Sequence, residues 1–323
     1  MQLRNRAKVL AAARAEFAQH GYRDATIDRI AARADLTRGA VYSNFAGKRA
    51  LYFTALDDPD PVRARVGRAT SAVEGLAAFA AAWLDREHPA PDAIPELVGT
   101  PYAGLLGLNA VLLGLSLDAL SPGGLGRMIC VSRLALTLLT GATQLTSAPG
   151  FVQPLAVARA CGHLTDLELD DPWTPPPTAP PIRPAEEQWS APSMVDEVRH
   201  RPADLDSPGV IAVLGLNRLS AVEDVVRSAG GTVTIALVSS HPDELGPLAR
   251  YTTGSLLSCL QQLLPRVQLV HDESGVLASA LGCEVIGDDL EYAAAIGDGR
   301  ILTRAEGFGA AYALARTAGI RGR

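Results

Sequence analysis

Residues 26–53 decide the fold of the first part of the chain, and they read Thr26-Ile-Asp-Arg-Ile-Ala-Ala-Arg-Ala-Asp-Leu-Thr37-Arg-Gly-Ala-Val-Tyr42-Ser-Asn-Phe45-Ala-Gly-Lys48-Arg-Ala-Leu-Tyr-Phe53. Two segments of this stretch have helical periodicity, and each begins at a threonine. Thr26 and Thr37 are good N-cap residues, because their hydroxyl groups can accept a hydrogen bond from a backbone N–H group that the first helical turn leaves without a partner. Two capped helices separated only by Asp35 and Leu36 predict a helix-turn-helix.

The second of these helices has an inward and an outward face. Val41 and Phe45 lie one turn apart and are predicted to face the core. Arg38, Gly39 and Tyr42 then lie on the outward side. Because the second helix of a helix-turn-helix enters the major groove, this outward side predicts a DNA-contacting surface.

The residue types on this side suit contacts with DNA. The guanidinium of Arg38 can donate to O6 and N7 of guanine, and Gly39 allows a close backbone approach. Tyr42 and Asn44 can donate to phosphate oxygens, and Lys48 begins a helix whose free N–H groups also favour a phosphate. The alternative is that these residues are solvated charges and a packing tyrosine. Because both caps, the turn length and the outward residues coincide, we predict DNA contacts from Thr26, Thr37, Arg38, Gly39, Tyr42, Asn44 and Lys48.

This part of the chain, from about Ala7 to Leu56, resembles the DNA-binding domain of the TetR family. Residues 9–22, which end in Gly-Tyr, are similar to the family's first helix. Residues 26–31 are similar to its second helix, and residues 37–48 to its recognition helix and the start of its fourth helix. The family usually has His in place of Asn44 and Ser in place of Gly47. The resemblance implies a transcriptional regulator, a repressor that binds a palindromic operator in double-stranded DNA as a homodimer and responds to a small-molecule effector.

Charge divides the chain of 323 residues into a basic head and an acidic remainder. Residues 1–56 hold 10 Lys and Arg against 4 Asp and Glu, a net charge of +6, whereas the whole chain carries −6. A basic head suits a protein that presents one end to DNA. The acidic remainder argues against a second nucleic-acid surface.

The cysteine pattern and the apolar segments indicate no metal, cofactor or membrane partner. The four cysteines, at positions 130, 161, 259 and 283, stand far apart and form no C-x-x-C pair. The N-terminus lacks the apolar core of a signal peptide, and we expect no segment to reach the roughly 18 uncharged apolar residues that span a bilayer. The sequence therefore predicts a cytoplasmic protein.

Residues 57–170 predict an all-helical body. Helical apolar patterns occupy residues 62–85, 101–120, 126–145 and 154–169. The resemblance implies that the last two of these helices pair with their counterparts in a second copy as a four-helix bundle. It also places the effector site in this region, where Phe79, Trp83, Tyr102 and Asn109 are the candidate lining residues, although packed core is the better explanation for any one of them taken alone.

The last part of the chain changes class after a Pro-rich linker at residues 171–192. Within residues 193–323, apolar segments predict three parallel strands with intervening helices, then a hairpin around Gly297-Asp-Gly-Arg300 and a final helix. This order resembles a thioredoxin-like fold, and residues 267–282 resemble peroxiredoxin-type members. The predicted fold class is thus multi-domain: an all-α head (1–56) and body (57–170), then an α/β thioredoxin-like domain.

This last domain lacks the residues for thiol chemistry that the resemblance would imply. The fold's reactive Cys follows the first strand, where this chain has Gly215-Leu-Asn-Arg-Leu-Ser220, and the usual cis-proline is missing before the fourth strand. We therefore predict no enzyme activity. The alternatives are a redox-sensing regulator, a thiol-dependent enzyme that uses this domain, and an interaction module.

Overall fold

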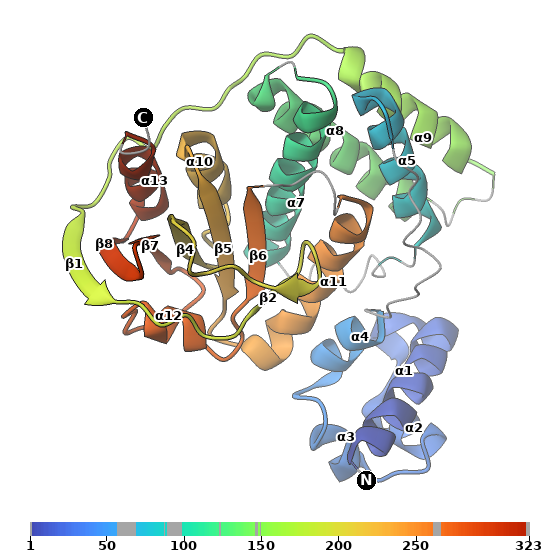
Figure 1. The fold of residues 1–323 in the computed structure, drawn as a ribbon. Coiled ribbons are helices and arrows are strands. Elements are labelled where there is room, and N and C mark those ends of the chain that lie inside the picture. Colours follow the sequence, from blue (N-terminus) through green and yellow to red (C-terminus); the bar gives the residue numbers. More distant parts are fainter. Residues whose placement is uncertain are drawn as a thin grey trace.

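The computed structural model describes residues 2–56, 69–86, 88, 99–122, 124–145, 148, 150–260 and 266–320. Its first four helices form a head at one end of the molecule (Figure 1): α1 (Gln2–Asp24), α2 (Ile27–Arg33), α3 (Arg38–Tyr42) and α4 (Lys48–Leu56). The head is closed by aromatic packing, with the ring centroids of Phe17 and Tyr22 both 4.9 Å from that of Tyr52. The predicted helical head with a helix-turn-helix is confirmed.

The regular elements in the described part of the body are helices, as predicted. The described ones are α5 (Ala72–Asp85), α7 (Gly99–Leu120), α8 (Leu125–Gln144) and α9 (Pro154–His163), and the 3-10 turn η2 (Leu164–Asp166) follows α9. The first part of the predicted helix at 62–85 lies outside the described residues. Helices α7 and α8 approach closely at Gly114, where an added Cβ would lie 2.9 Å from the backbone nitrogen of Ile129.

Two body helices correct an expectation from the sequence. Pro101–Leu120 and Leu125–Gln144 are long and apolar enough to cross a membrane, although no such segment was expected. The uncharged run that includes most of α7 extends from Leu97 to Leu117 and was underestimated. About half of each helix is buried inside the protein, which is what the core helix of a helical body also shows.

The last part of the chain contains a six-stranded mixed sheet of order β1-β8-β7-β4-β5-β6 (Figure 1). Strands β4, β5 and β6 are parallel, whereas β7, β8 and β1 join by antiparallel pairing. In chain order the strands are β1 (Arg183–Gln188), β4 (Gly209–Gly215), β5 (Thr232–Val238), β6 (Val267–His271), β7 (Glu291–Gly297) and β8 (Arg300–Glu306). A separate pair joins β2 (Val195–Asp196) and β3 (Arg201–Pro202).

The central strands of this sheet are buried on both faces, which explains why they read as continuous apolar runs. In β4, Val210 and Ala212 belong to one cluster, and Ile211 and Val213 belong to another. The first cluster includes side chains from α10 (Ala221–Ser228), α11 (Pro242–Leu260) and α13 (Ala310–Ile320). The second includes side chains from α12 (Val276–Ala280) and from the segment that precedes β4. The α/β class is therefore confirmed.

The predicted linker is partly built into the sheet. Within residues 171–192, strand β1 pairs with β8 at the sheet edge. Trp189 is buried and donates from Nε1 to the carbonyl of Leu205 at 2.9 Å. The strand was not predicted because most of its side chains are exposed and it contains Pro184, which an edge strand tolerates.

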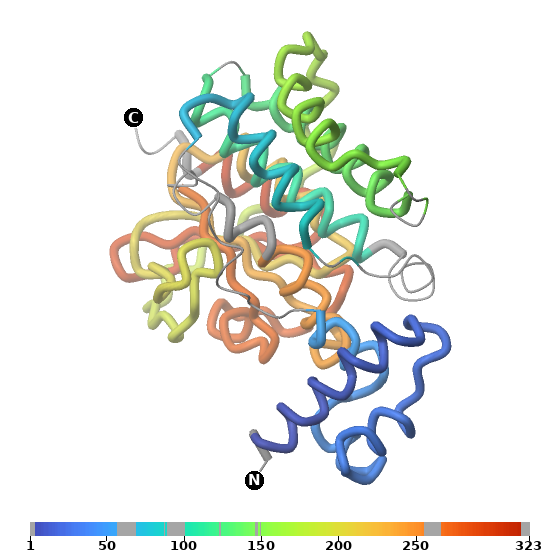
Figure 2. Tube along the Cα trace, turned by 90° about the vertical axis from the view of Figure 1, so that its right-hand side faces the viewer, coloured from blue at the N-terminus to red at the C-terminus, as the bar shows by residue number. Residues whose placement is uncertain are grey.

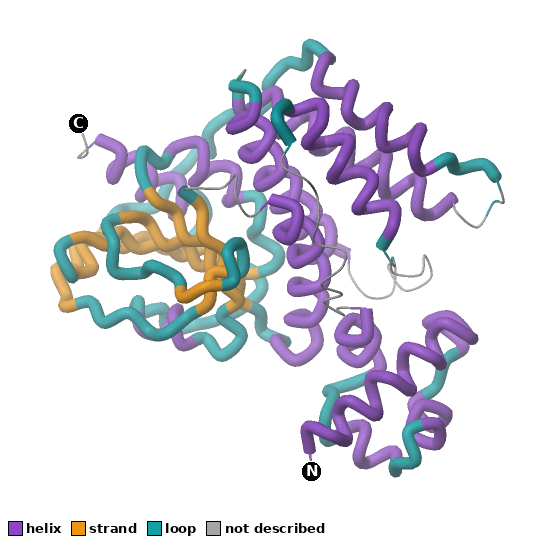
Figure 3. Tube along the Cα trace, turned by 45° about the vertical axis from the view of Figure 1, so that its right-hand side comes forward, coloured by secondary structure: helices purple, strands orange, loops and turns teal. Residues whose placement is uncertain are grey.

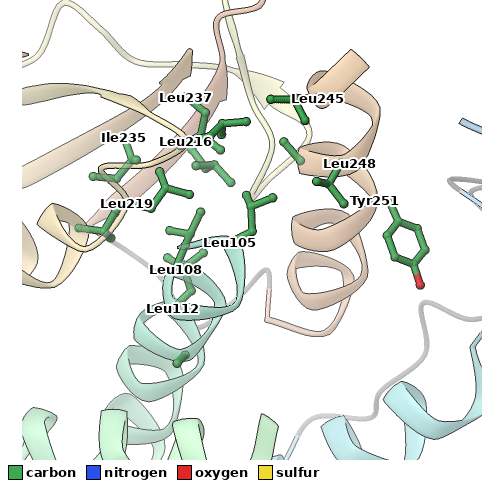
Figure 4. Close-up of a cluster of buried hydrophobic side chains, with 14 of the residues drawn as sticks. Leu105, Leu108, Leu112, Leu216, Leu219, Ile235, Leu237, Leu245, Leu248 and Tyr251 are labelled. Carbon is green, nitrogen blue, oxygen red and sulfur yellow. The ribbon is translucent and has the colours of Figure 1, made fainter. Parts of the chain in front are cut away.

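The helical body and the α/β domain share a core. Leu105 and Leu108 on α7 lie among Leu216, Leu219 and Leu248 of the α/β domain (Figure 4). Figure 3 shows the whole chain from another side, with the strands in orange beside the helices in purple. These parts of the chain are joined by apolar packing and not only by the segment that links them.

Gly104 and Gly107 on α7 offer a matched test of this shared core. An added Cβ at Gly104 would lie 2.9 Å from the backbone oxygen of Leu216, whereas one at Gly107 would meet nothing within 4 Å. We expect Gly104→Ala to lower the free energy of unfolding by about 1–3 kcal/mol through overpacking. The control Gly107→Ala should raise it by about 0.5–1 kcal/mol, because alanine favours the helix. Urea denaturation of both variants tests this, and equal stabilisation by both would contradict the close packing of α7 on the α/β domain.

Candidate nucleic-acid interface

The helix-turn-helix is held by the two caps that the sequence predicts. The hydroxyl of Thr26 accepts from the backbone N–H of Arg29, and that of Thr37 accepts from Ala40, both at 3.3 Å. Asp35 turns the chain between the helices with a φ of 55°, a conformation that aspartate adopts more readily than most residues. Both predicted threonines therefore set the start of their helices.

The outward face of α3 carries the predicted residues together. The Arg38 side chain is 61% exposed and lies 3.4 Å from Asp28 and 3.5 Å from the hydroxyl of Tyr42. The hydrogen bond with Tyr42 and the charge of Asp28 raise the pKa of Arg38. Gly39 is exposed, and the nearest atom to an added Cβ would be the hydroxyl of Thr37 at 3.9 Å. A cation, a phenol and an open backbone thus share one accessible surface.

Asn44 and Lys48 differ from this group, because both are engaged inside the head. Asn44 donates from Nδ2 to the carbonyl of Ala40 at 2.8 Å. The ammonium of Lys48 donates to the carbonyl of Arg23 at 3.0 Å and lies 4.6 Å from the ring centroid of Tyr22. A phosphate at either residue would have to share these groups with the protein.

The sequence did not reveal two charged residues that hold the helix-turn-helix against α1. The first is Arg6, and a basic residue so near the N-terminus could extend as a minor-groove arm. It instead lies in α1, where it donates to the carbonyl of Asn44 at 2.9 Å and stacks on Phe45 at 4.4 Å. Its contact partners are far along the chain, so no local pattern could have indicated them.

The second missed residue is Glu16, which is 1% exposed and forms ion pairs with Arg29 and Arg33 of α2. Burial acts to raise the pKa of this carboxyl, but the hydrogen bond and charge of Arg29 outweigh it and leave the pKa lowered. Glu16 could have been found, because it falls on the apolar stripe of α1 beside Ala13 and Phe17.

Residues 9–55 match the family model described as bacterial regulatory proteins, tetR family. The head is therefore similar to the DNA-binding domain of this family. The match supports a DNA-binding transcriptional regulator, and it includes the capped helices and the outward face of α3. The matched residues end within α4, before the body and the α/β domain. No curated protein matches the chain.

Behind the TetR-type head, the candidate effector residues are brought together in part. Phe79 and Trp83 on α5 are buried, with their ring centroids 5.7 Å apart. Asn109 on α7 is also buried, but it turns to the α/β domain and donates from Nδ2 to the carbonyl of Thr252 on α11 at 2.8 Å. Tyr102 is partly buried, and this burial raises its pKa.

Two further residues, which the sequence analysis did not identify, lie in this region: Arg86 and His88. The guanidinium of Arg86 lies 3.8 Å from the ring centroid of Trp83 and 5.1 Å from that of Tyr251. Burial, with a smaller effect of Arg86, lowers the pKa of His88 to about 4, so this histidine is neutral near pH 7. Within the described part of the chain, Asn109 Oδ1, Trp83 Nε1 and Thr252 Oγ1 are buried without a hydrogen-bond partner. Because buried polar atoms almost always form hydrogen bonds, a water molecule or a ligand is the expected partner of these atoms.

The α/β domain shows no activated thiol among its described cysteines. Burial raises the pKa of Cys283, and in the body it raises that of Cys161 to about 11. At the site where the resemblance implies a reactive Cys, Arg218 forms a 2.5 Å ion pair with the buried Glu291. Leu216 beside it packs under α7. Among the residues that the structure describes, no group of three or more His, Cys, Asp or Glu could hold a metal ion.

Proposed function

We propose that the protein is a homodimeric repressor that binds a palindromic operator through α3 of its TetR-type head. The observation that carries this proposal is the accessible face formed by Arg38, Gly39 and Tyr42 on a capped second helix. The net charge of +6 on residues 1–56 favours the approach of this face to DNA. We place the protein in the cytoplasm, where such an operator is accessible.

Arg38→Ala and Lys48→Ala should weaken DNA binding in different ways. Arg38→Ala should cost about 1–3 kcal/mol at one base pair and relax the preference there, because the variant cannot donate to the base edge. Lys48→Ala should weaken binding to all sequences alike and lower the slope of log affinity against log salt by about one. Titration of operator duplexes selected from a random pool, at several salt concentrations, measures both effects. Arg300→Ala, an exposed arginine of the α/β domain, is the control. Unchanged affinity of Lys48→Ala at every salt concentration would contradict the proposed docking.

The dimer is supported by an exposed apolar face on α8 and α9. Leu134, Leu138 and Leu145 are exposed along α8 and at its end, and Phe151 and Leu155 are exposed at the start of α9. Large apolar side chains gathered on neighbouring elements indicate a contact surface. A symmetric dimer would cover this face and would present two heads to the two half-sites of a palindrome.

Replacing two residues of this face with charge should break the dimer. We expect Leu134→Asp with Leu138→Asp to shift the protein to a monomer at micromolar concentration, because four like charges would meet across a two-fold axis. Val285→Asp, which changes an exposed apolar residue of the α/β domain, should leave the dimer intact. Light scattering measures the mass of each. A wild-type monomer, or a dimer of the double variant, would refute this interface.

We further propose that the body binds a small effector at the region of Phe79, Trp83, Tyr102 and Asn109. The unpartnered atoms there include an acceptor, Asn109 Oδ1, and a donor, Trp83 Nε1. They favour a small aromatic molecule that carries both a donor and an acceptor, such as a phenol or a carboxamide. An effector that binds more tightly to a form whose two recognition helices do not match the two half-sites would weaken operator binding.

A library of small phenols and aromatic carboxamides tests this site by thermal shift and by operator release. We expect an active compound to release operator from the wild type and not from Asn109→Leu, which replaces the amide by an apolar side chain with the same branching. Asn109→Leu must bind operator normally without the compound to serve as the comparison. Equal release from both proteins would place the effector elsewhere.

For the α/β domain, we propose a thioredoxin-like module without thiol chemistry. The order of strands and helices from β4 to α13 supports this assignment, with three parallel strands followed by a hairpin whose turn residues Asp298 and Gly299 have positive φ. The raised pKa values of the described cysteines disfavour the redox-sensing alternative. Its contacts with the other parts of the chain favour the interaction-module alternative.

A further inference from the structure

The main contact between the head and the rest of the described chain is made by the α/β domain. Helix α4 of the head packs against α11 (Figures 1 and 2). Arg49 on α4 lies 3.6 Å from the carboxylate of Glu244 on α11. One to two turns further along each helix, the ring centroids of Phe53 and Tyr251 are 6.5 Å apart, and both rings are buried. The contact thus combines an ion pair at the surface with aromatic packing beneath it.

Helix α11 is itself fixed to the helical body. Leu248 packs with Leu105 of α7, and Thr252 accepts the hydrogen bond of the buried Asn109. Tyr251 takes part in the contacts of α11 with both the head and the body. Its ring lies near Phe53 of the head and near the guanidinium of Arg86, which follows α5. A continuous series of packed helices therefore runs from the head through α11 to α7 and α8.

The docked head still presents its recognition surface. A groove of about 400 Å³ separates the end of α3 from the start of α11, with Tyr42 and Asn44 on one side and Asp243 and Glu273 on the other. Arg38 remains 61% exposed in this arrangement. In this position α4 packs against α11, and the outward face of α3 remains accessible to DNA.

We propose that the contact between α4 and α11 sets the separation of the two recognition helices and so determines which half-site spacing the protein accepts. This inference rests on the proposed dimer and its palindromic operator. Two half-sites of a palindrome lie about 34–36 Å apart, or a multiple of this, and rigidly held heads match one such distance. A head without this packing on α11 lacks its main described contact with the rest of the chain. It then loses more freedom on binding, and it can reach half-sites at several distances.

Two variants of α11 test this inference. Glu244→Arg places a like charge against Arg49 on a side chain that is 41% exposed, so the fold should tolerate it. Adding Tyr251→Ala removes the aromatic packing as well. The matched control is Glu187→Arg, which breaks a surface ion pair of 2.7 Å with Arg304 at the far edge of the sheet. Circular dichroism and thermal unfolding establish that each protein is folded.

The measurement is affinity for a series of duplexes that carry the same half-sites at spacings increased or decreased one base pair at a time. We expect the wild type and Glu187→Arg to prefer one spacing sharply. Glu244→Arg should flatten this profile, and the double variant should flatten it further and lose about tenfold in affinity at the best spacing. Affinity for a duplex with a single half-site should stay unchanged, because the recognition surface is intact.

Charge exchange provides a second check. Arg49→Glu combined with Glu244→Arg restores an attractive pair and should recover the wild-type spacing profile. If Arg49 also binds a phosphate directly, replacing it weakens binding to the single half-site and to every spaced duplex. The single half-site affinity therefore measures this effect separately from the spacing profile. A folded Glu244→Arg, Tyr251→Ala protein with the wild-type spacing profile would overturn the inference. A wild-type protein that binds no palindrome better than a single half-site would instead refute the proposed function.

Discussion

The packing of α7 against the α/β domain is the interaction on which the rest of the arrangement depends. Leu105 and Leu108 insert between the start of α10 and helix α11, and Gly104 allows the backbone of the two parts to meet. Apolar burial of this kind is the main source of stability in folded chains. This packing joins the helical body and the mixed sheet into one core. It also fixes the position of α11, against which α4 packs.

The α/β domain therefore lies in contact with both the head and the body. In the thioredoxin-like fold that the sequence resembles, the segment after the first of the parallel strands carries a reactive thiol. In this chain Leu216 and Leu219 of that segment lie under α7. Folds can be retained while the chemistry of their site disappears. Arg133 of α8 adds a polar link, because it pairs with the buried Glu223 of α10. The α/β domain thus contacts α4, α7 and α8 together.

The head shows which parts of a site can be predicted from sequence. Thr26 and Thr37 were found because a cap acts on backbone groups only three residues away. The exposure of Arg38 and Tyr42 on α3 was predicted, because helical periodicity separates inward from outward residues. Arg6 was missed, since its partner Asn44 is 38 residues distant. In the body, Asn109 was proposed as a ligand group, and its bond to Thr252, 143 residues away, could not be anticipated.

Local order was available from the amino-acid sequence, because caps, apolar periodicity and turn residues such as Asp298-Gly299 act over a few neighbouring positions. The two capped helices, the parallel strands and the terminal hairpin all follow from such signals. Strand β1 does not, because an exposed edge strand has little apolar pattern and exists only through its pairing with β8. The partner of α7 was equally hidden. A helix that is apolar on nearly every side must be buried, but its own residues do not specify what buries it, and only the assembled chain selected α10 and α11.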